Sequence, residues 1–145
     1  MSESQRFPVA VHALVYLAHK GARTVAGAVP SAALAASMPT NPVVVRRVTA
    51  LLGKAGLIGA RAGAGGGAWL AVAPDKITLD LVLRAVDGCA HLGVPPVGAR
   101  GCPIGEKIPR VVEAAIRAAD AAAAERLSQI TVADLLAQID VSAVA

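Results

Sequence analysis

One short segment, Gly63-Ala64-Gly65-Gly66-Gly67, constrains the fold of this chain most, because four of its five residues are glycines. It separates two short apolar runs, 57–62 and 68–73, and Pro74 ends the second run. Glycine adopts the positive φ angles that a tight hairpin tip requires, at no steric cost. The sequence therefore predicts a two-stranded β-hairpin whose tip is built from glycine.

A sharply defined helix start precedes this hairpin. Pro39 cannot continue the short helix that Ser31 is expected to cap, so the chain must turn there. Asn41 is a favourable N-cap, and Pro42 fits the first helical position because its missing N–H is not needed there. This second helix runs to Gly56, which is suited to end it. Two helices joined by a tight turn and followed by a hairpin predict a winged helix-turn-helix.

Helical patterns flank this unit on both sides. Apolar residues recur at helical spacing over 3–20, and Thr78 caps a further helix that ends at Gly88. A glycine- and proline-rich loop precedes a long, alanine-rich helix over 106–128, and Thr131 caps a last short helix. The expected fold is mainly α with a small β-hairpin wing. Its expected parts are a winged helix-turn-helix domain at 1–88, a loop at 89–105, and a dimerisation helix with a short C-terminal helix at 106–145.

The long helix carries an apolar seam along one side, at three- and four-residue steps. Its alanine content lets a second helix approach closely, and the helix is longer than the first domain needs. These properties predict a homodimer. The seam consists of Val112, Ile116, Ala119, Ala123 and Leu127.

Charge is divided unevenly along the chain. Residues 1–73 hold seven Lys or Arg and one acid, for a net charge of +6, whereas the remainder holds seven bases and nine acids, for −2. A basic half beside a mildly acidic one favours double-stranded DNA as a partner. Arg46 and Arg47 lie in the first two turns of the second helix of the motif, where side chains reach phosphates or base edges. Arg61, beside the wing, and Arg6 are weaker candidates.

Taken in order, these segments resemble the Rrf-type bacterial transcription regulators, the family that includes IscR, NsrR and CymR. The resemblance covers nearly the whole chain and implies a homodimeric repressor or activator whose third helix enters the major groove while the wing contacts the minor groove. The segments that carry it are Ala13-Leu14-Val15-Tyr16-Leu17-Ala18, Asn41-Pro42-Val43-Val44-Val45-Arg46-Arg47, Lys54-Ala55-Gly56-Leu57, the glycine wing with Leu70-Ala71, and Ile77-Thr78-Leu79. The DNA contacts that it implies are Asn41, Val43, Val44, Arg46, Arg47, Arg61, Gly63, Gly65 and Gly66.

The wing departs from the family pattern. Many members have an arginine directly before the wing glycines and an aromatic residue directly after them. Here those two positions hold Ala62 and Ala68. The arginine, Arg61, comes one residue before Ala62, and the aromatic residue, Trp69, comes one residue after Ala68. This departure weakens the expectation that the wing reads the minor groove.

The loop before the long helix contains the only two cysteines of the chain, Cys89 and Cys102. Cluster-binding members of the family carry three cysteines there, and His91 alone does not complete a ligand set. The segment 102–105 looks most like the YwnA-type branch, which lacks the cluster, so we expect no cofactor and no metal. Cys102 lies where a helix N-terminus favours a thiolate, so the two thiols are either inert or a redox switch. An unidentified small molecule is the remaining candidate effector.

A nucleotide-binding enzyme is a competing interpretation of the glycines. Gly63, Gly65 and Ala68 fit the spacing G-x-G-x-x-A, but that motif must open a helix, and a strand ended by Pro74 is expected here. No lysine follows Gly67, as a P-loop would require, and no catalytic triad or carboxylate pair stands out. We therefore expect that the protein is not an enzyme.

Two functions remain. The first is a sequence-specific transcription regulator, expected to be a repressor, that acts as a homodimer on a dyad-symmetric operator. The alternative is a dimeric interaction or sensor protein of the same fold that does not bind DNA. No segment reaches the roughly eighteen uninterrupted apolar residues of a membrane-spanning helix, so we expect a cytoplasmic protein with no membrane partner.

Overall fold

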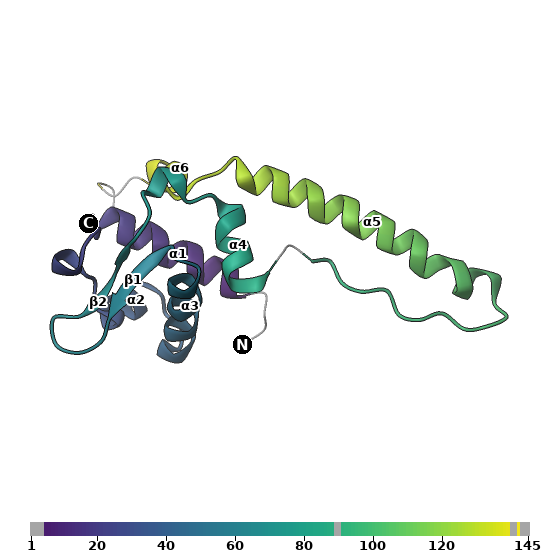
Figure 1. The fold of residues 1–145 in the computed structure, drawn as a ribbon, viewed down its shortest axis with the longest axis horizontal. Helices are drawn as coiled ribbons and strands as arrows, with labels where there is room; N and C mark the ends of the chain where they lie inside the picture. Colours follow the sequence, from purple (N-terminus) through teal and green to yellow (C-terminus); the bar gives the residue numbers. More distant parts are fainter. Residues whose placement is uncertain (1–4, 89–90, 140–141, 143–145) are drawn as a thin grey trace.

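A computed structural model of the chain describes residues 5–88, 91–139 and 142. The described residues form a compact helical unit with one hairpin, from which a single long helix projects (Figure 1). The mainly α fold with a β-hairpin wing is thereby confirmed. In chain order the elements are α1 (Arg6–His19), the 3-10 turn η2 (Val25–Gly27), α2 (Ser31–Ser37), α3 (Pro42–Lys54), β1 (Ile58–Arg61), β2 (Gly67–Leu70), the 3-10 turn η3 (Pro74–Lys76), α4 (Leu79–Asp87), α5 (Pro103–Ser128) and α6 (Val132–Ala137).

Helix α1 forms the centre of the core. Its buried residues lie on one face because they are spaced by three and four positions: Ala10, Ala13, Leu14 and Leu17. Helices α3, α4 and α6 all pack against this helix. The inner stripe of α3, with Val45, Val48 and Leu52, is also fully buried. These contacts leave the opposite face of α3 to solvent.

Helices α2 and α3 are joined at 38–41, as the proline there predicts. The Asn41 side chain accepts a hydrogen bond from the backbone N–H of Val43 at 2.9 Å, and Pro42 occupies the first helical position. Both details of the predicted start of α3 are confirmed. The expected cap of α2 was wrong, because Ser31 is already helical and Pro30 precedes it without a side-chain cap.

Strands β1 and β2 pair antiparallel from Ile58 opposite Leu70 to Arg61 opposite Gly67. The strands are shorter than the apolar runs that predicted them. A third segment, which the sequence left as loop, joins the hairpin: Val29 and Ala68 exchange two backbone hydrogen bonds of 2.9 Å. This bridge ties the base of the wing to the segment that leads into α2.

The long helix α5 begins three residues earlier than expected. Pro103 occupies its first position, and the Cys102 Sγ accepts a hydrogen bond from the Gly105 N–H at 3.3 Å. Cysteine is not among the residues that usually cap helices, so this start was not predictable from local sequence. No helix in the part of the chain that the structure describes is long and apolar enough to cross a membrane.

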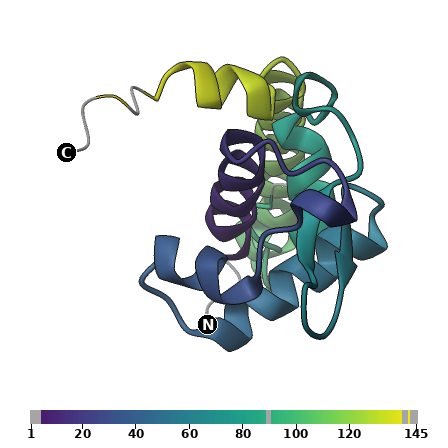
Figure 2. The same cartoon turned by 90° about the vertical axis from the view of Figure 1, so that its left-hand side faces the viewer.

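After α5 the chain returns to the compact unit. Thr131 and Asp134 form a reciprocal capping box at the start of α6, and Val132 is fully buried. The Leu79 N–H donates to the Ile130 carbonyl and the Val132 N–H donates to the Ile77 carbonyl, both at 2.9 Å. Helix α6 therefore lies beside α1 (Figure 2), although it follows the long helix in sequence.

Candidate nucleic-acid interface

The exposed face of α3 carries the predicted DNA-contacting residues. Arg46 and Arg47 are exposed, and Val43, one turn before them, is 43 % exposed. Val44 differs from its neighbour, because its side chain is half-buried against the core. The structure therefore places Val43, and not Val44, on the surface that α3 presents to solvent.

Arg46 and Arg61 converge on one hollow, although they belong to different elements. A groove of about 470 Å³ lies between α3 and the wing, and both arginines line it. Ser31 and Thr49 line it as well. We call this hollow the α3–wing groove. Because it combines two guanidinium groups with hydroxyl and backbone groups, it offers charge-assisted hydrogen bonds to a phosphate.

Arg47 lies on α3 outside the residues that line the α3–wing groove. It lies in the second turn of α3, which runs from Pro42 to Lys54. Arg6, at the start of α1, lies 4.0 Å from a carboxylate oxygen of Asp87, so an acid partly offsets its charge. The structure thus separates the four candidate arginines into a pair at the groove, one on α3 outside the groove, and one beside an acid.

The tip of the wing needs glycine for two different reasons. Gly63 and Gly65 have φ angles of +90° and +72°, which side-chain-bearing residues rarely adopt. Gly66 is required by close packing, since a Cβ there would lie 2.1 Å from the Arg61 carbonyl oxygen. Gly63 and Gly66 line the α3–wing groove, whereas Gly65 does not.

Replacing Gly66 with alanine is expected to distort the wing, because the added Cβ meets backbone atoms that cannot rotate away. Overpacking of this kind costs about 1–3 kcal/mol. We expect a melting temperature lower by several degrees and weaker DNA binding, measured by calorimetry and by fluorescence anisotropy. Gly65→Asn is the matched control, because asparagine tolerates the left-handed region and nothing lies within 4 Å. Equal melting temperatures for Gly66→Ala and the parent would contradict this account of the wing.

Trp69 is partly buried and packs against the core. Its indole ring covers Gly59 on the opposite strand so closely that a Cβ at Gly59 would lie 2.4 Å from the ring. The tryptophan therefore stabilises the hairpin. Trp69, which stands one residue after the position of the family's wing aromatic, therefore has a structural role in this chain.

The donor set before α5 does not fit an iron–sulphur cluster. Cys102 is exposed and its Sγ caps α5, whereas Cys89 lies outside the described residues. His91 Nδ1 lies 3.5 Å from the Asp120 carboxylate of α5, away from the cap. Among the residues that the structure describes, no three His, Cys, Asp or Glu side chains gather as a metal site would need.

The residues of the predicted dimer seam differ in exposure. Ile116, Ala123 and Leu127 are half-buried, whereas Val112 and Ala119 are exposed. Exposed apolar side chains also continue along an adjacent face toward the start of the helix. They are spaced by four, three and four positions, and we call them the α5 stripe: Ile104, Ile108, Val111 and Ala115.

Sequence reasoning missed the polar contacts between α1 and the helix-turn-helix. The His12 side chain is exposed, and its Nε2 lies 2.8 Å from the Ser37 Oγ at the end of α2. It also missed Ser31 and Thr49 as lining residues of the α3–wing groove. No sequence signal could have found these pairs, because they join separate elements.

Comparison with known proteins agrees with this geometry. Residues 3–138 match the family model Rrf2, described as iron-dependent transcriptional regulator. The chain is 36 % identical over 104 residues to the "Putative HTH-type transcriptional regulator YwnA" of Bacillus subtilis. The aligned residues cover 71 % of this chain and 77 % of the relative. A solved "putative transcriptional regulator" from Lactobacillus plantarum superposes with a TM-score of 0.75 at 29 % identity, over 91 % of this chain and 87 % of that one. CymR, the global cysteine regulator of B. subtilis, superposes with a TM-score of 0.64 at 25 % identity, over 93 % and 95 % of the two chains.

Proposed function

Because the chain belongs to the Rrf2 family of DNA-binding transcription regulators, we propose that it binds a dyad-symmetric operator as a homodimer and represses transcription by occupying it. The observation that carries the proposal is the joint lining of the α3–wing groove by Arg46 and Arg61. The first belongs to the helix that would enter the major groove, and the second to the wing. A DNA backbone seated in this groove would be held from both sides.

The charge around this groove supports the proposal. No Asp or Glu occurs between residues 4 and 74, so no acid of these elements offsets Arg46, Arg47 or Arg61. The three arginines are exposed and make none of the ion pairs found among the described residues. Their guanidinium groups are therefore available to phosphates and to base edges.

The exposed apolar surface of α5 supports the homodimer. This helix has no buried residue, and the compact unit contacts it mainly through α4. Helices in proteins owe most of their stability to the packing of an apolar face against another element. A second copy of α5, lying against the α5 stripe, would supply that packing and relate the two units by a two-fold axis.

The proposal predicts a steep dependence of DNA binding on salt. Each phosphate neutralised by Lys or Arg releases counterions. Two copies would bring six exposed arginines to the DNA, namely Arg46, Arg47 and Arg61 of each copy. With about six to ten phosphate contacts, the affinity falls by roughly 10³- to 10⁵-fold between 50 and 200 mM salt. Fluorescence anisotropy with a labelled duplex, titrated at several salt concentrations, measures this slope. A slope near zero would contradict binding through this basic face.

A further inference from the structure

The start of α3 presents an exposed valine to solvent. Three valines, 43–45, follow Pro42 in the first turn of the helix. Val45 is buried in the core and Val44 packs against it, whereas Val43 is 43 % exposed and is not among the described residues that form the core or pack on it. Valine also has a lower helix propensity than alanine. Packing and helix formation therefore give no reason for a valine at position 43.

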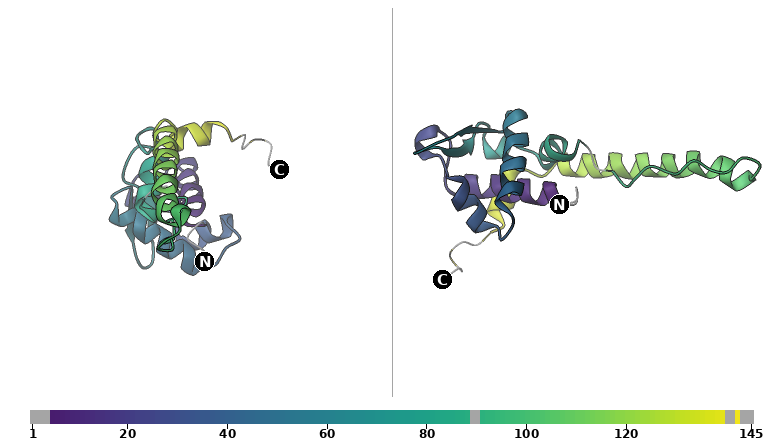
Figure 3. Two further views of the ribbon diagram at one scale, coloured as in Figure 1. Left: turned by 90° about the vertical axis from the view of Figure 1, so that its right-hand side faces the viewer. Right: turned by 90° about the horizontal axis from the view of Figure 1, so that it is seen from below.

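Val43 shares its face of α3 with the two exposed arginines. Arg46 and Arg47 follow it by three and four residues, the spacing that makes side chains neighbours on a helix. At a rise of about 1.5 Å per residue, Val43 lies about 6 Å along the axis from Arg47, which corresponds to about two base-pair steps of DNA. Helix α5 projects away from the compact unit that contains α3 (Figure 3). This face thus places an apolar side chain beside two cations, and it is open to solvent.

The polar side chain at this helix start is already engaged. The Asn41 Oδ1 accepts a hydrogen bond from the Val43 N–H at 2.9 Å. An asparagine that reads adenine uses its oxygen and its amide nitrogen together, in a bidentate contact. The cap uses the oxygen for the helix instead. Base reading on this face of α3 therefore falls to Val43 and the two arginines.

The chemistry of a valine side chain restricts what it can recognise. It has no hydrogen-bond donor or acceptor, so the feature of a base pair that it can select in the major groove is the C5-methyl group of thymine. Packing it on a polar base edge would leave that edge without a hydrogen-bond partner, at a cost in free energy. Recognition helices contact bases through their N-terminal residues, and Val43 is the second residue of α3.

Resting on the DNA-binding function proposed above, we propose that Val43 is a specificity-determining residue that selects thymine by contact with its methyl group. The arginines supply hydrogen bonds to guanine or to phosphate, and Val43 supplies an apolar contact at a neighbouring base pair. The thymine lies about two base pairs from the Arg47 contact. In a two-fold symmetric complex each half-site contains one such thymine.

Removing single methyl groups from the DNA tests this inference. The probe is the consensus duplex that the full-length protein selects from a random-sequence library. Each thymine is replaced in turn by deoxyuridine, which forms the same base pair but lacks the methyl group. We expect one symmetry-related pair of thymines at which a single replacement weakens binding about four-fold, as expected for one buried methyl group. For Val43→Ala the same replacement should have little effect, because the contacting methyl groups of the valine are gone. Fluorescence anisotropy measures both affinities.

Leu81→Ala is the matched control, because Leu81 is 44 % exposed but lies on α4. This variant should keep the full preference of the parent for thymine over deoxyuridine. A second series replaces the same thymine with cytosine or with 5-methylcytosine. The parent should bind the methylated base more tightly than cytosine, and Val43→Ala should not distinguish the two. Circular dichroism verifies that both variants are folded.

The outcomes separate this inference from the proposed function. A library that yields no consensus sequence would overturn both, because the protein would then not read sequence. A parent that binds its consensus but tolerates deoxyuridine at every thymine would overturn thymine selection and leave operator binding intact. The same holds if deoxyuridine weakens binding of Val43→Ala as much as binding of the parent, since another residue would then contact the methyl group.

Discussion

The Arg46→Ala/Arg47→Ala variant is expected to bind operator DNA about a hundred-fold more weakly than the parent. An arginine that contacts a base or a phosphate contributes about 1–3 kcal/mol, and 1.4 kcal/mol corresponds to tenfold in affinity. Both side chains lie opposite the buried stripe of α3, so the fold should remain intact. Fluorescence anisotropy measures the affinity, and circular dichroism verifies the fold.

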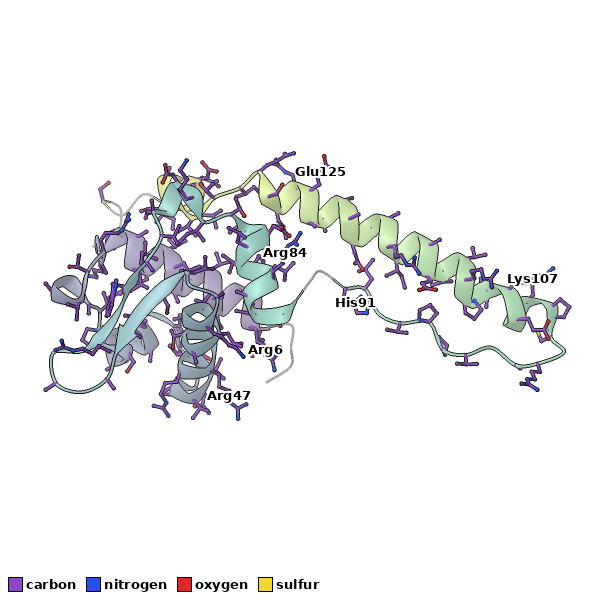
Figure 4. The ribbon with its side chains drawn as sticks, in the orientation of Figure 1. Arg6, Arg47, Arg84, His91, Lys107 and Glu125 are labelled. Carbon is purple, nitrogen blue, oxygen red and sulfur yellow. The ribbon has the colours of Figure 1, made fainter. Side chains whose placement is uncertain are left out.

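Arg84→Ala/Arg117→Ala is the matched control, because it removes the same charge from exposed positions on α4 and α5. Figure 4 places Arg84 well away from Arg47. We expect a small, salt-sensitive loss for this control. Equal losses for the two double variants would mean that only net charge matters, and an unchanged affinity for Arg46→Ala/Arg47→Ala would refute the assignment of α3.

If the proposed homodimer forms, replacing Val111 with glutamate is expected to convert it into a monomer. The side chain belongs to the α5 stripe and is exposed in a single chain, so its replacement should not disturb the fold of that chain. In the proposed dimer each copy would bury an unpaired carboxylate, and an uncompensated buried charge destabilises by about 3–5 kcal/mol. Multi-angle light scattering at a series of concentrations measures the change. DNA affinity should fall with it, because a monomer contacts only one half-site.

Ala121→Glu provides the control for this variant. Ala121 is exposed on the same helix but lies on another face, about a third of a turn from the α5 stripe at 100° per residue. We expect it to remain dimeric. A monomer produced by Ala121→Glu but not by Val111→Glu would place the interface on the other side of α5.

The elements defined by local chemistry were predictable from the sequence. The start of helix α3 was predicted correctly because Asn41 caps the helix and Pro42 fits its first position. Helix α4 was predicted because Thr78 caps its start and Gly88 ends it. The hairpin followed from its glycines. Each of these signals depends only on neighbours in the chain.

Features that depend on distant segments were not predictable. The Val29 bridge to Ala68 involves a single residue and leaves no alternating pattern, and the start of α5 depends on a thiol cap. In α5 nearly every face contains alanine, so the spacing alone did not show which side faces α4. The pairing of Arg46 with Arg61 arises only when the wing folds beside α3.

Selection of bound fragments from the source genome tests the central claim most directly. Purified full-length protein is incubated with sheared genomic DNA at moderate salt, and the retained fragments are sequenced. The account predicts strong enrichment of a few sites that share a dyad-symmetric sequence, and loss of that enrichment for Arg46→Ala/Arg47→Ala. Retention of fragments without any common sequence, or no retention above bulk DNA, would contradict an operator-binding regulator and favour an interaction protein with the same fold.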